Sequence, residues 1–247
     1  MTPGTLELLL ALADEADAIT RARARAVGRV ERKPDASPVT AADRKVEAAL
    51  RARLAVERPD DGVLGEEGGG DGSAAGRRWL LDPIDGTVHF ARGVPLWATL
   101  IGLQEDGEAV AGMVSAPALA RRWWGVRGSP SAWRVSGVDA FGDAVFTVSR
   151  LWAAGAAARA RVDALAKRCW YPGGYESFLG PVMVAEGAID LALLPEVEPW
   201  DVVPLQAVVE AAGGRCSLLD CGAPRIGALF SNAALHEEAL AALTASR

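Results

Sequence analysis

The chain has 247 residues, of which 50% are hydrophobic, so it is long enough for one large domain or two small ones with an ample core. Its formal net charge of −6 argues against a general binder of nucleic acids, because such binders neutralise phosphates with basic patches. The basic run over residues 21–29 alternates with alanine and is interpreted as a solvated helix surface.

The first half of the chain, residues 1–142, is predicted to combine two helices with a sheet. Its expected elements are helices over residues 5–28 and 41–57 and strands at residues 63–64, 79–81, before 106, 109–115 and 122–127. The strand at residues 79–81 should stop at Asp82, because an Asp-Pro pair starts a turn. The Asp106-Gly107 pair predicts a hairpin, and the glycine-rich residues 68–76 are expected to be flexible.

The second half, residues 143–247, is predicted to alternate helices and strands. Its expected elements are a strand at residues 144–149, helices over 151–168 and 175–187, a strand at 189–194, a helix over 201–212, strands near 216 and 229, and a helix over 235–245. Helices and sheets in layers indicate an α+β fold. The two halves should meet near residue 142 with the functional site between them.

The most informative segment is the run of six residues from Asp82 to Thr87, which follows an apolar strand. A turn there brings the carboxylates of Asp82 and Asp85 and the carbonyl of Ile84 toward one point, and Mg²⁺ prefers such oxygen donors. Gly86 lets the backbone approach a ligand closely, and free N–H groups at Thr87 attract an anion. The alternative is an ordinary turn, because Asp-Pro and Asp-Gly pairs are common in loops that bind nothing.

Further acids stand at comparable places in the chain. Glu66 and Glu67 follow an apolar strand, and Asp43 and Asp201 each open a helical segment. Singly, Asp43 and Asp201 could be acids that favour a first helical turn, and the glutamates could be a solvated loop. That account explains each acid alone better than it explains the set.

Together these residues resemble the inositol monophosphatase superfamily of Mg²⁺-dependent, lithium-sensitive phosphomonoesterases. The matching segments, in order, are Thr40-Ala41-Ala42-Asp43, Gly65-Glu66-Glu67, Asp82 to Thr87, and Trp200-Asp201 with Ala212-Gly213-Gly214. Residues 92–101, 114–119, 121–124 and 184–188 look most like the actinobacterial type of histidinol-phosphate phosphatase within that superfamily. The resemblance implies a layered α-β-α-β-α sandwich of the inositol monophosphatase and fructose-1,6-bisphosphatase type.

The resemblance also implies a set of metal ligands for two or three Mg²⁺ ions. Glu66, Asp82 and the Ile84 carbonyl would hold a first ion. Asp82, Asp85 and Asp201 would hold a second, with Asp82 bridging the two. Such a pair of ions can clamp the attacking and leaving oxygens of an in-line displacement, without a covalent enzyme intermediate.

Roles for the remaining site residues follow from the same resemblance. Asp43 and Thr87 would orient the attacking water, with Glu66 assisting. The backbone N–H groups of Gly86 and Thr87 would hold the phosphate. Glu67 would support the ligands or bind a weaker third ion.

The sequence departs from the histidinol-phosphate phosphatase pattern at residues near the leaving group. His89 stands near a position where the subgroup has asparagine, and Ser177 and Leu194 align with acids. Losing both acids removes charged partners for an ammonium group, which argues against histidinol phosphate as substrate. Three nearby acids could compensate: Glu176, Glu196 and Glu198. The predicted substrate-binding residues are Asp85, Gly86, Thr87, His89, Ser177, Leu194 and Asp201.

Two residues keep an ordinary interpretation beside the functional one. Lys33 matches a loop near the site in the family, but a solvated lysine is favoured on the sequence alone. His89 could face the substrate or lie in the first turn of a helix with its hydrogen bonds satisfied, and we favour the substrate.

The predicted function is hydrolysis of a phosphate monoester in a small metabolite, like that of histidinol-phosphate phosphatases. Inositol, sugar or nucleoside monophosphates are alternative substrates, and a catalytically inactive metal-binding or phosphate-binding relative is a hypothesis of another class. The three cysteines predict neither a zinc site nor a disulfide framework. Glu7 interrupts the N-terminal apolar stretch, so we expect no signal peptide, no membrane contact and a cytoplasmic protein. We also expect a homodimer.

Overall fold

The computed structural model describes residues 4–23, 30–33, 38–70, 76–221 and 226–245. The end of the first predicted helix after residue 23, most of the basic run and the centre of the glycine-rich stretch lie outside these ranges. No helix in the described ranges is both long and apolar enough to cross a membrane.

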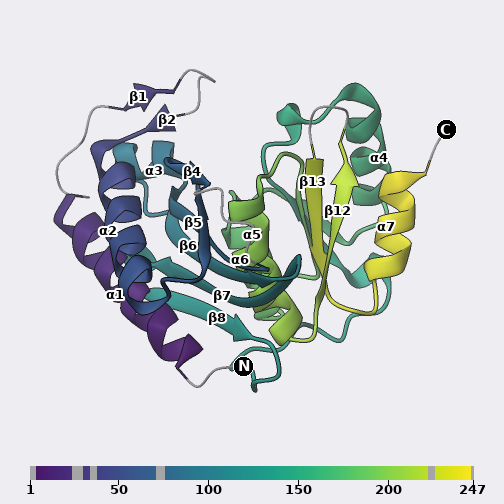
Figure 1. Ribbon diagram of the computed structural model, residues 1–247. Coiled ribbons are helices and arrows are strands. Elements are labelled where there is room, and N and C mark those ends of the chain that lie inside the picture. Colours follow the sequence, from purple (N-terminus) through teal and green to yellow (C-terminus); the bar gives the residue numbers. More distant parts are fainter. Residues whose placement is uncertain (1–3, 24–29, 34–37, 71–75, 222–225, 246–247) are drawn as a thin grey trace.

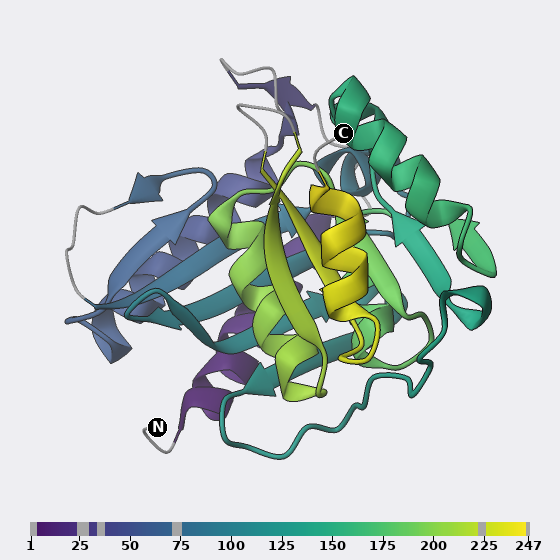
Figure 2. The same ribbon diagram turned by 90° about the vertical axis from the view of Figure 1, so that its right-hand side faces the viewer.

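Five layers of alternating helices and sheets form the molecule (Figure 1). Helices α1 and α2 cover the outer face of a six-stranded sheet, and α5 and α6 lie between this sheet and a five-stranded one. Helices α4 and α7 cover the outer face of the second sheet, and Figure 2 shows α7 lying across it. This arrangement confirms the predicted α-β-α-β-α sandwich.

The six-stranded sheet has the order β4-β3-β5-β6-β7-β8, in which only β3 and β5 pair in parallel. The elements of the first half are α1 (Thr5–Arg23), β1 (Glu31–Arg32), β2 (Pro38–Val39), α2 (Ala41–Glu57), β3 (Gly62–Gly65), β4 (Gly69–Gly70), β5 (Arg77–Asp85), α3 (Thr87–Arg92), β6 (Ala98–Glu105), β7 (Glu108–Ala116) and β8 (Arg121–Val126). The predicted hairpin joins β6 and β7, with Asp106 and Gly107 both at positive φ.

The five-stranded sheet has the order β10-β9-β11-β13-β12, with β9 parallel to both of its neighbours. The elements of the second half are β9 (Val145–Val148), α4 (Ala156–Ala166), β10 (Tyr171–Gly173), α5 (Leu179–Ala185), β11 (Leu191–Leu194), α6 (Pro199–Ala211), β12 (Arg215–Asp220), β13 (Ile226–Ser231) and α7 (His236–Thr244). Strand β10 escaped prediction because its three residues include a proline and lie at the sheet edge.

Two predicted helices of the second half were too long at their N-terminal ends. Helix α4 begins at Ala156, because residues Leu151–Ala153 form a separate 3₁₀ turn. Helix α5 begins at Leu179, because Ser177 has a φ of +42° and cannot continue a right-handed helix. The residues between β10 and α5 instead form a loop that approaches the first half.

Strand β5 does not stop at Asp82, as the Asp-Pro pair predicted, but continues to Asp85. Its pairing with β6 slips there, because Asp82 lies opposite Leu100 and Asp85 lies opposite Ala98. Two residues of β5 therefore face one residue of β6, which is the geometry of a β-bulge. The bulge accommodates Pro83, whose carbonyl accepts a hydrogen bond from Thr99 Oγ1 at 2.8 Å.

One hydrophobic cluster joins the two halves. It contains Leu100, Val114 and Trp123 from the first sheet and Phe178 and Phe230 from the second half. Helix α6 packs against strands of both sheets. The division of the chain at residue 142 stays a prediction, because the shared cluster neither requires nor excludes separately folding halves.

Helix α6 can approach the first sheet closely because glycines face it. A Cβ atom added at Gly125 would lie 2.1 Å from the Ala207 carbonyl oxygen. We expect Gly125→Ala to lower the free energy of unfolding by about 1–3 kcal/mol or more, because backbone must move to relieve the overlap. Gly137→Ala is the control, since a Cβ there meets nothing within 4 Å. Equal denaturation midpoints for the two variants would contradict this account of the packing.

Candidate active site

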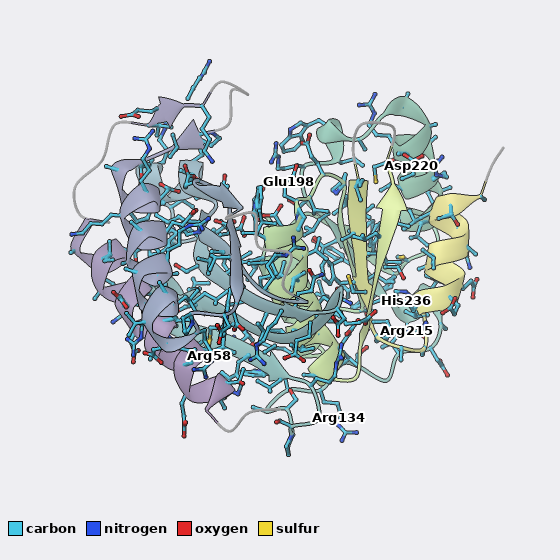
Figure 3. The ribbon with its side chains drawn as sticks, in the orientation of Figure 1. Arg58, Arg134, Glu198, Arg215, Asp220 and His236 are labelled. Carbon is cyan, nitrogen blue, oxygen red and sulfur yellow. The ribbon has the colours of Figure 1, made fainter. Side chains whose placement is uncertain are left out.

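Acidic residues from both halves meet at the bulged end of β5. Asp82 and Asp85 come from the bulge, Asp43 from the first turn of α2, and Asp201 from the first turn of α6. Glu198, the residue before α6, marks this region between the two halves in Figure 3. The negative charges of Glu66, Asp85, Asp201 and Asp43 all act on the carboxyl group of Asp82. The sequence-predicted acids therefore gather in one place.

Asp43 is fully buried and held in a fixed orientation by the residue that caps α2. Its Oδ2 atom accepts hydrogen bonds from the backbone N–H of Thr40, at 2.9 Å, and from the Thr40 hydroxyl. The Thr40 hydroxyl accepts the N–H of Ala42, so its own proton is directed to Asp43. The other oxygen, Oδ1, lies 3.3 Å from the Thr87 hydroxyl. The predicted contact between Asp43 and Thr87 is therefore present.

Asp201 has the same position in α6 that Asp43 has in α2. Its Oδ2 accepts the backbone N–H of Glu198 at 2.7 Å. Both acids thus lie in the first turn of a helix, as their ordinary interpretation held, where each completes a capping box, and both also contribute charge to the acidic site. Capping fixes each carboxylate at the start of its helix, so the two interpretations do not compete.

Asp82 is the least compensated acid of the group. It is 3% exposed, and its Oδ1 atom has no hydrogen-bond partner among the described residues. Burial raises the pKa of Asp82 well above its usual value, and the negative charges of Glu66, Asp85, Asp201 and Asp43 raise it further. A buried carboxylate surrounded by like charges costs free energy unless a cation neutralises it.

Asp85 belongs to β5, but its carboxylate is held by the second half of the chain. The Ser177 hydroxyl donates to Oδ1, and the backbone N–H of Phe178 donates to Oδ2 at 2.9 Å. Burial raises the pKa of Asp85 to about 6 against the lowering effect of these two hydrogen bonds. His89 is close enough for its charge to lower the same pKa, so it lies near Asp85, half-buried in the first turn of α3. Its contact with the substrate stays a prediction.

Lys33 is not the solvated lysine that the sequence favoured. Its Nζ atom lies 2.9 Å from Glu66 Oε1 and 2.7 Å from Glu67 Oε1, and its side chain is 16% exposed. Burial lowers the pKa of Lys33, but the hydrogen bonds and charges of the two glutamates outweigh burial, so the pKa is raised. The family resemblance had matched Lys33 to a loop near the site, whereas local propensity alone does not reveal this long-range contact.

Of the other predicted substrate-binding residues, Gly86 and Ser177 lie beside the acids, whereas Leu194 lies in the hydrophobic core. Gly86, with a φ of +84°, precedes α3 and allows the chain to turn from the bulge into that helix. Leu194, in contrast, is 5% exposed and belongs to the hydrophobic cluster that includes Phe230. Ser177 contacts Asp85 through its hydroxyl. The supporting roles of Thr40 and Phe178 were not predicted, although Thr40 has the spacing of a helix-capping box with Asp43.

The donor set fits hard divalent cations. Mg²⁺ prefers oxygen ligands, and the site offers carboxylates and one backbone carbonyl. Asp82, whose Oδ1 has no hydrogen-bond partner among the described residues, is influenced by the charges of four other acids. Within the described ranges, however, no three acidic, histidine or cysteine side chains are already gathered as a ligand set. Lys33 engages Glu66, so a small rotation of the Glu66 side chain would have to accompany ion binding.

The shifted pKa values predict how the metal-free protein responds to pH. Asp85 has its pKa raised to about 6, so its favourable contribution to folding is present below about pH 4 and is lost as the pH rises through 6. The full change is about 3 kcal/mol. We expect the stability of wild type relative to Asp85→Asn to increase between pH 7.5 and 5, measured by urea denaturation in a chelator. A difference independent of pH would contradict the raised pKa.

The match to a family model decides the relationship of this chain to known proteins. Residues 5–247 match the model of the inositol monophosphatase family. The chain belongs to this family. It is 45% identical to a histidinol-phosphatase from Mycobacterium tuberculosis, over 99% of this chain and 100% of that protein. It is 44% identical to a histidinol-phosphatase from Streptomyces coelicolor, over 95% of each chain.

A solved structure confirms the relationship at the level of the fold. An inositol monophosphatase from Zymomonas mobilis superposes with a TM-score of 0.85 and 30% identity, covering 98% of this chain and 99% of the other. Membership of the family makes the chain a phosphate monoester hydrolase that acts on a small phosphorylated metabolite. The sequence-predicted family and enzyme class are therefore confirmed.

Proposed function

We propose that the chain hydrolyses the phosphate ester of a small alcohol with the help of Mg²⁺, and that histidinol phosphate is the first substrate to test. The buried acidic group around the unpartnered Asp82 Oδ1 supports the metal requirement. The 45% identity to a histidinol-phosphatase over the whole chain supports the substrate. Two or three ions, a homodimer and a cytoplasmic location complete the proposal, following the family resemblance.

The metal ligands in this proposal are the side chains of Glu66, Asp82, Asp85 and Asp201 and the carbonyl of Ile84. Bound ions would supply a water of lowered pKa and would neutralise the phosphate. A divalent ion bound to Glu66 would displace the Lys33 ammonium group from that carboxylate, because the ion carries the larger charge. Lys33 would remain paired with Glu67.

Asp43 and Thr87 handle the proton of the attacking water. Thr40 saturates Oδ2 of Asp43, so Oδ1 is left to accept the Thr87 hydroxyl. The Thr87 hydroxyl also lies 3.1 Å from the Ile84 carbonyl oxygen, which is its competing acceptor. When Thr87 donates to Asp43, its own oxygen can accept a water proton, which orients that water. The N–H groups of Gly86 and Thr87 hold the phosphate oxygens in the proposal.

A neutral polyol phosphate, such as an inositol monophosphate, is the second candidate substrate. Ser177 and Leu194 are uncharged, so neither can pair with an ammonium group. The Ser177 hydroxyl also donates to Asp85, and Leu194 lies in the hydrophobic cluster. Glu176, Glu196 and Glu198 are the nearby carboxylates in the sequence that could still do so, and Glu196 lies 3.5 Å from Arg150 Nη2. The two candidates differ in charge, which makes the choice between them measurable.

A substrate panel tests the proposal. Phosphate release from histidinol phosphate, inositol monophosphates, sugar phosphates and nucleoside monophosphates is measured with Mg²⁺ and with EDTA. We expect hydrolysis only with Mg²⁺, and a much higher kcat/KM for one substrate class. Preference for histidinol phosphate would show that other acids replace the two missing ones. Absence of Mg²⁺-dependent hydrolysis across the panel would favour the inactive-relative hypothesis.

A further inference from the structure

Ser177 has two unusual features that occur together. It adopts a φ of +42°, a left-handed conformation that is strained for a residue with a Cβ atom. Its hydroxyl donates to Oδ1 of Asp85, a residue 92 positions earlier in the chain and in the other half of the molecule. Strained backbone persists where surrounding contacts impose it, and it is frequent at functional sites.

The contacts that impose this conformation come from β9 and β5. The Ser177 N–H donates to Ser149 Oγ at 3.1 Å, just after β9, and the next N–H, that of Phe178, donates to Asp85 Oδ2 at 2.9 Å. The left-handed turn at Ser177 therefore presents a hydroxyl and a backbone N–H to the same carboxylate. Both oxygens of Asp85 are held from the opposite half.

We infer that Ser177 is a positioning residue, which orients Asp85 for metal binding and couples the geometry of the ion site to the contact between the halves. The inference rests on the proposed function, because it takes Asp85 as a ligand. Each carboxylate oxygen has two lone pairs, so one can accept the protein hydrogen bond while the other faces an ion. Hydrogen bonds of this kind to metal ligands fix their orientation and raise metal affinity.

This role differs from direct contact with substrate, which the sequence predicted for Ser177. A substrate contact would leave metal affinity unchanged on removal of the hydroxyl and would raise KM. A positioning role predicts that the Mg²⁺ requirement increases even when no substrate is present. The two roles are therefore separated by measuring metal binding alone.

The test uses thermal unfolding of metal-free protein titrated with Mg²⁺, with no substrate. We expect Ser177→Ala to shift the Mg²⁺ midpoint about 10-fold higher than in wild type. Ser177→Gly should shift it equally, because it also lacks the hydroxyl. Its metal-free Tm should nevertheless lie about 2–4 °C above that of Ser177→Ala, because glycine adopts a φ of +42° without strain.

Ser136→Ala is the matched control. Its hydroxyl also donates to a buried aspartate, Asp190, in the second half and outside the site. We expect this variant to lose stability while its Mg²⁺ midpoint stays that of wild type. An unchanged or lower midpoint in Ser177→Ala would overturn the positioning role, and a raised KM with that result would assign Ser177 to the substrate. A wild-type protein that Mg²⁺ does not stabilise would refute the metal site itself, a distinct result that removes both proposals.

Discussion

Asp82→Asn is expected to abolish Mg²⁺-dependent phosphatase activity while leaving the fold intact. Asp82 is the proposed bridging ligand, and a neutral amide replaces the charge that holds two ions. Loss of metal assistance worth several kcal/mol corresponds to a decrease in kcat of about a thousandfold or more. Phosphate release at saturating Mg²⁺ measures the effect, and circular dichroism verifies the fold.

The same substitution should stabilise the metal-free protein at neutral pH. Asp82 lacks a partner for Oδ1 and is repelled by Glu66, Asp85 and Asp201, so removing its charge relieves an unfavourable interaction. We expect a higher Tm than wild type in EDTA and a lower Tm than wild type in Mg²⁺, because binding of an ion stabilises only the protein that holds it. This reversal in the order of the two Tm values, between EDTA and Mg²⁺, is the result expected only if Asp82 is a metal ligand.

Asp190→Asn provides the comparison for Asp82→Asn. Asp190 is also 3% exposed, but its carboxylate accepts hydrogen bonds from Ser136 and from the N–H of Val145. Replacing this satisfied carboxylate should lower Tm with and without Mg²⁺ and leave the Mg²⁺ requirement unchanged. Near-normal turnover in Asp82→Asn would contradict the assigned metal site, whatever its effect on stability.

Much of the site was predictable because its acids are placed by local features. Asp43 and Asp201 each stand three residues after a cap, so local helix chemistry fixes their positions. Asp82 and Asp85 follow the apolar residues 79–81 in the sequence, and their common location needed no knowledge of the tertiary fold. The prediction that the strand ends at Asp82 was wrong. A β-bulge paired with β6 accommodates Pro83 where the local sequence predicted a turn.

Contacts between distant segments could not be predicted in this way. Lys33 reaches Glu66 and Glu67 across more than thirty residues of sequence, and only the family resemblance of its loop, not local propensity, indicated that approach. Ser177 acquires its left-handed backbone from Ser149 and Asp85, so its conformation is imposed by tertiary structure. These are the residues whose interpretation changed most, since local propensity is weak evidence where long-range hydrogen bonds decide the backbone.

Thr87→Val is expected to lower kcat about 10²- to 10⁴-fold, the range for loss of a positioned proton acceptor or donor, with the Mg²⁺ midpoint unchanged. Valine keeps the shape of threonine but removes the hydroxyl that lies 3.3 Å from Asp43 Oδ1. Asp43→Asn should have a comparable effect, because its amide cannot take up a proton. The double variant should be little worse than either single one, because residues that act as a unit have non-additive effects.

Thr20→Val is the control for the loss of a buried threonine hydroxyl. Thr20 is fully buried, and its hydroxyl donates to the Ala16 carbonyl within α1, away from the acids. We expect a small change in Tm and normal kcat. Thr87→Val with normal kcat but a raised Mg²⁺ midpoint would instead place Thr87 among the groups that support the ions. Strictly multiplicative losses in the double variant would mean that Asp43 and Thr87 act separately, because a shared proton path is broken completely by the first substitution.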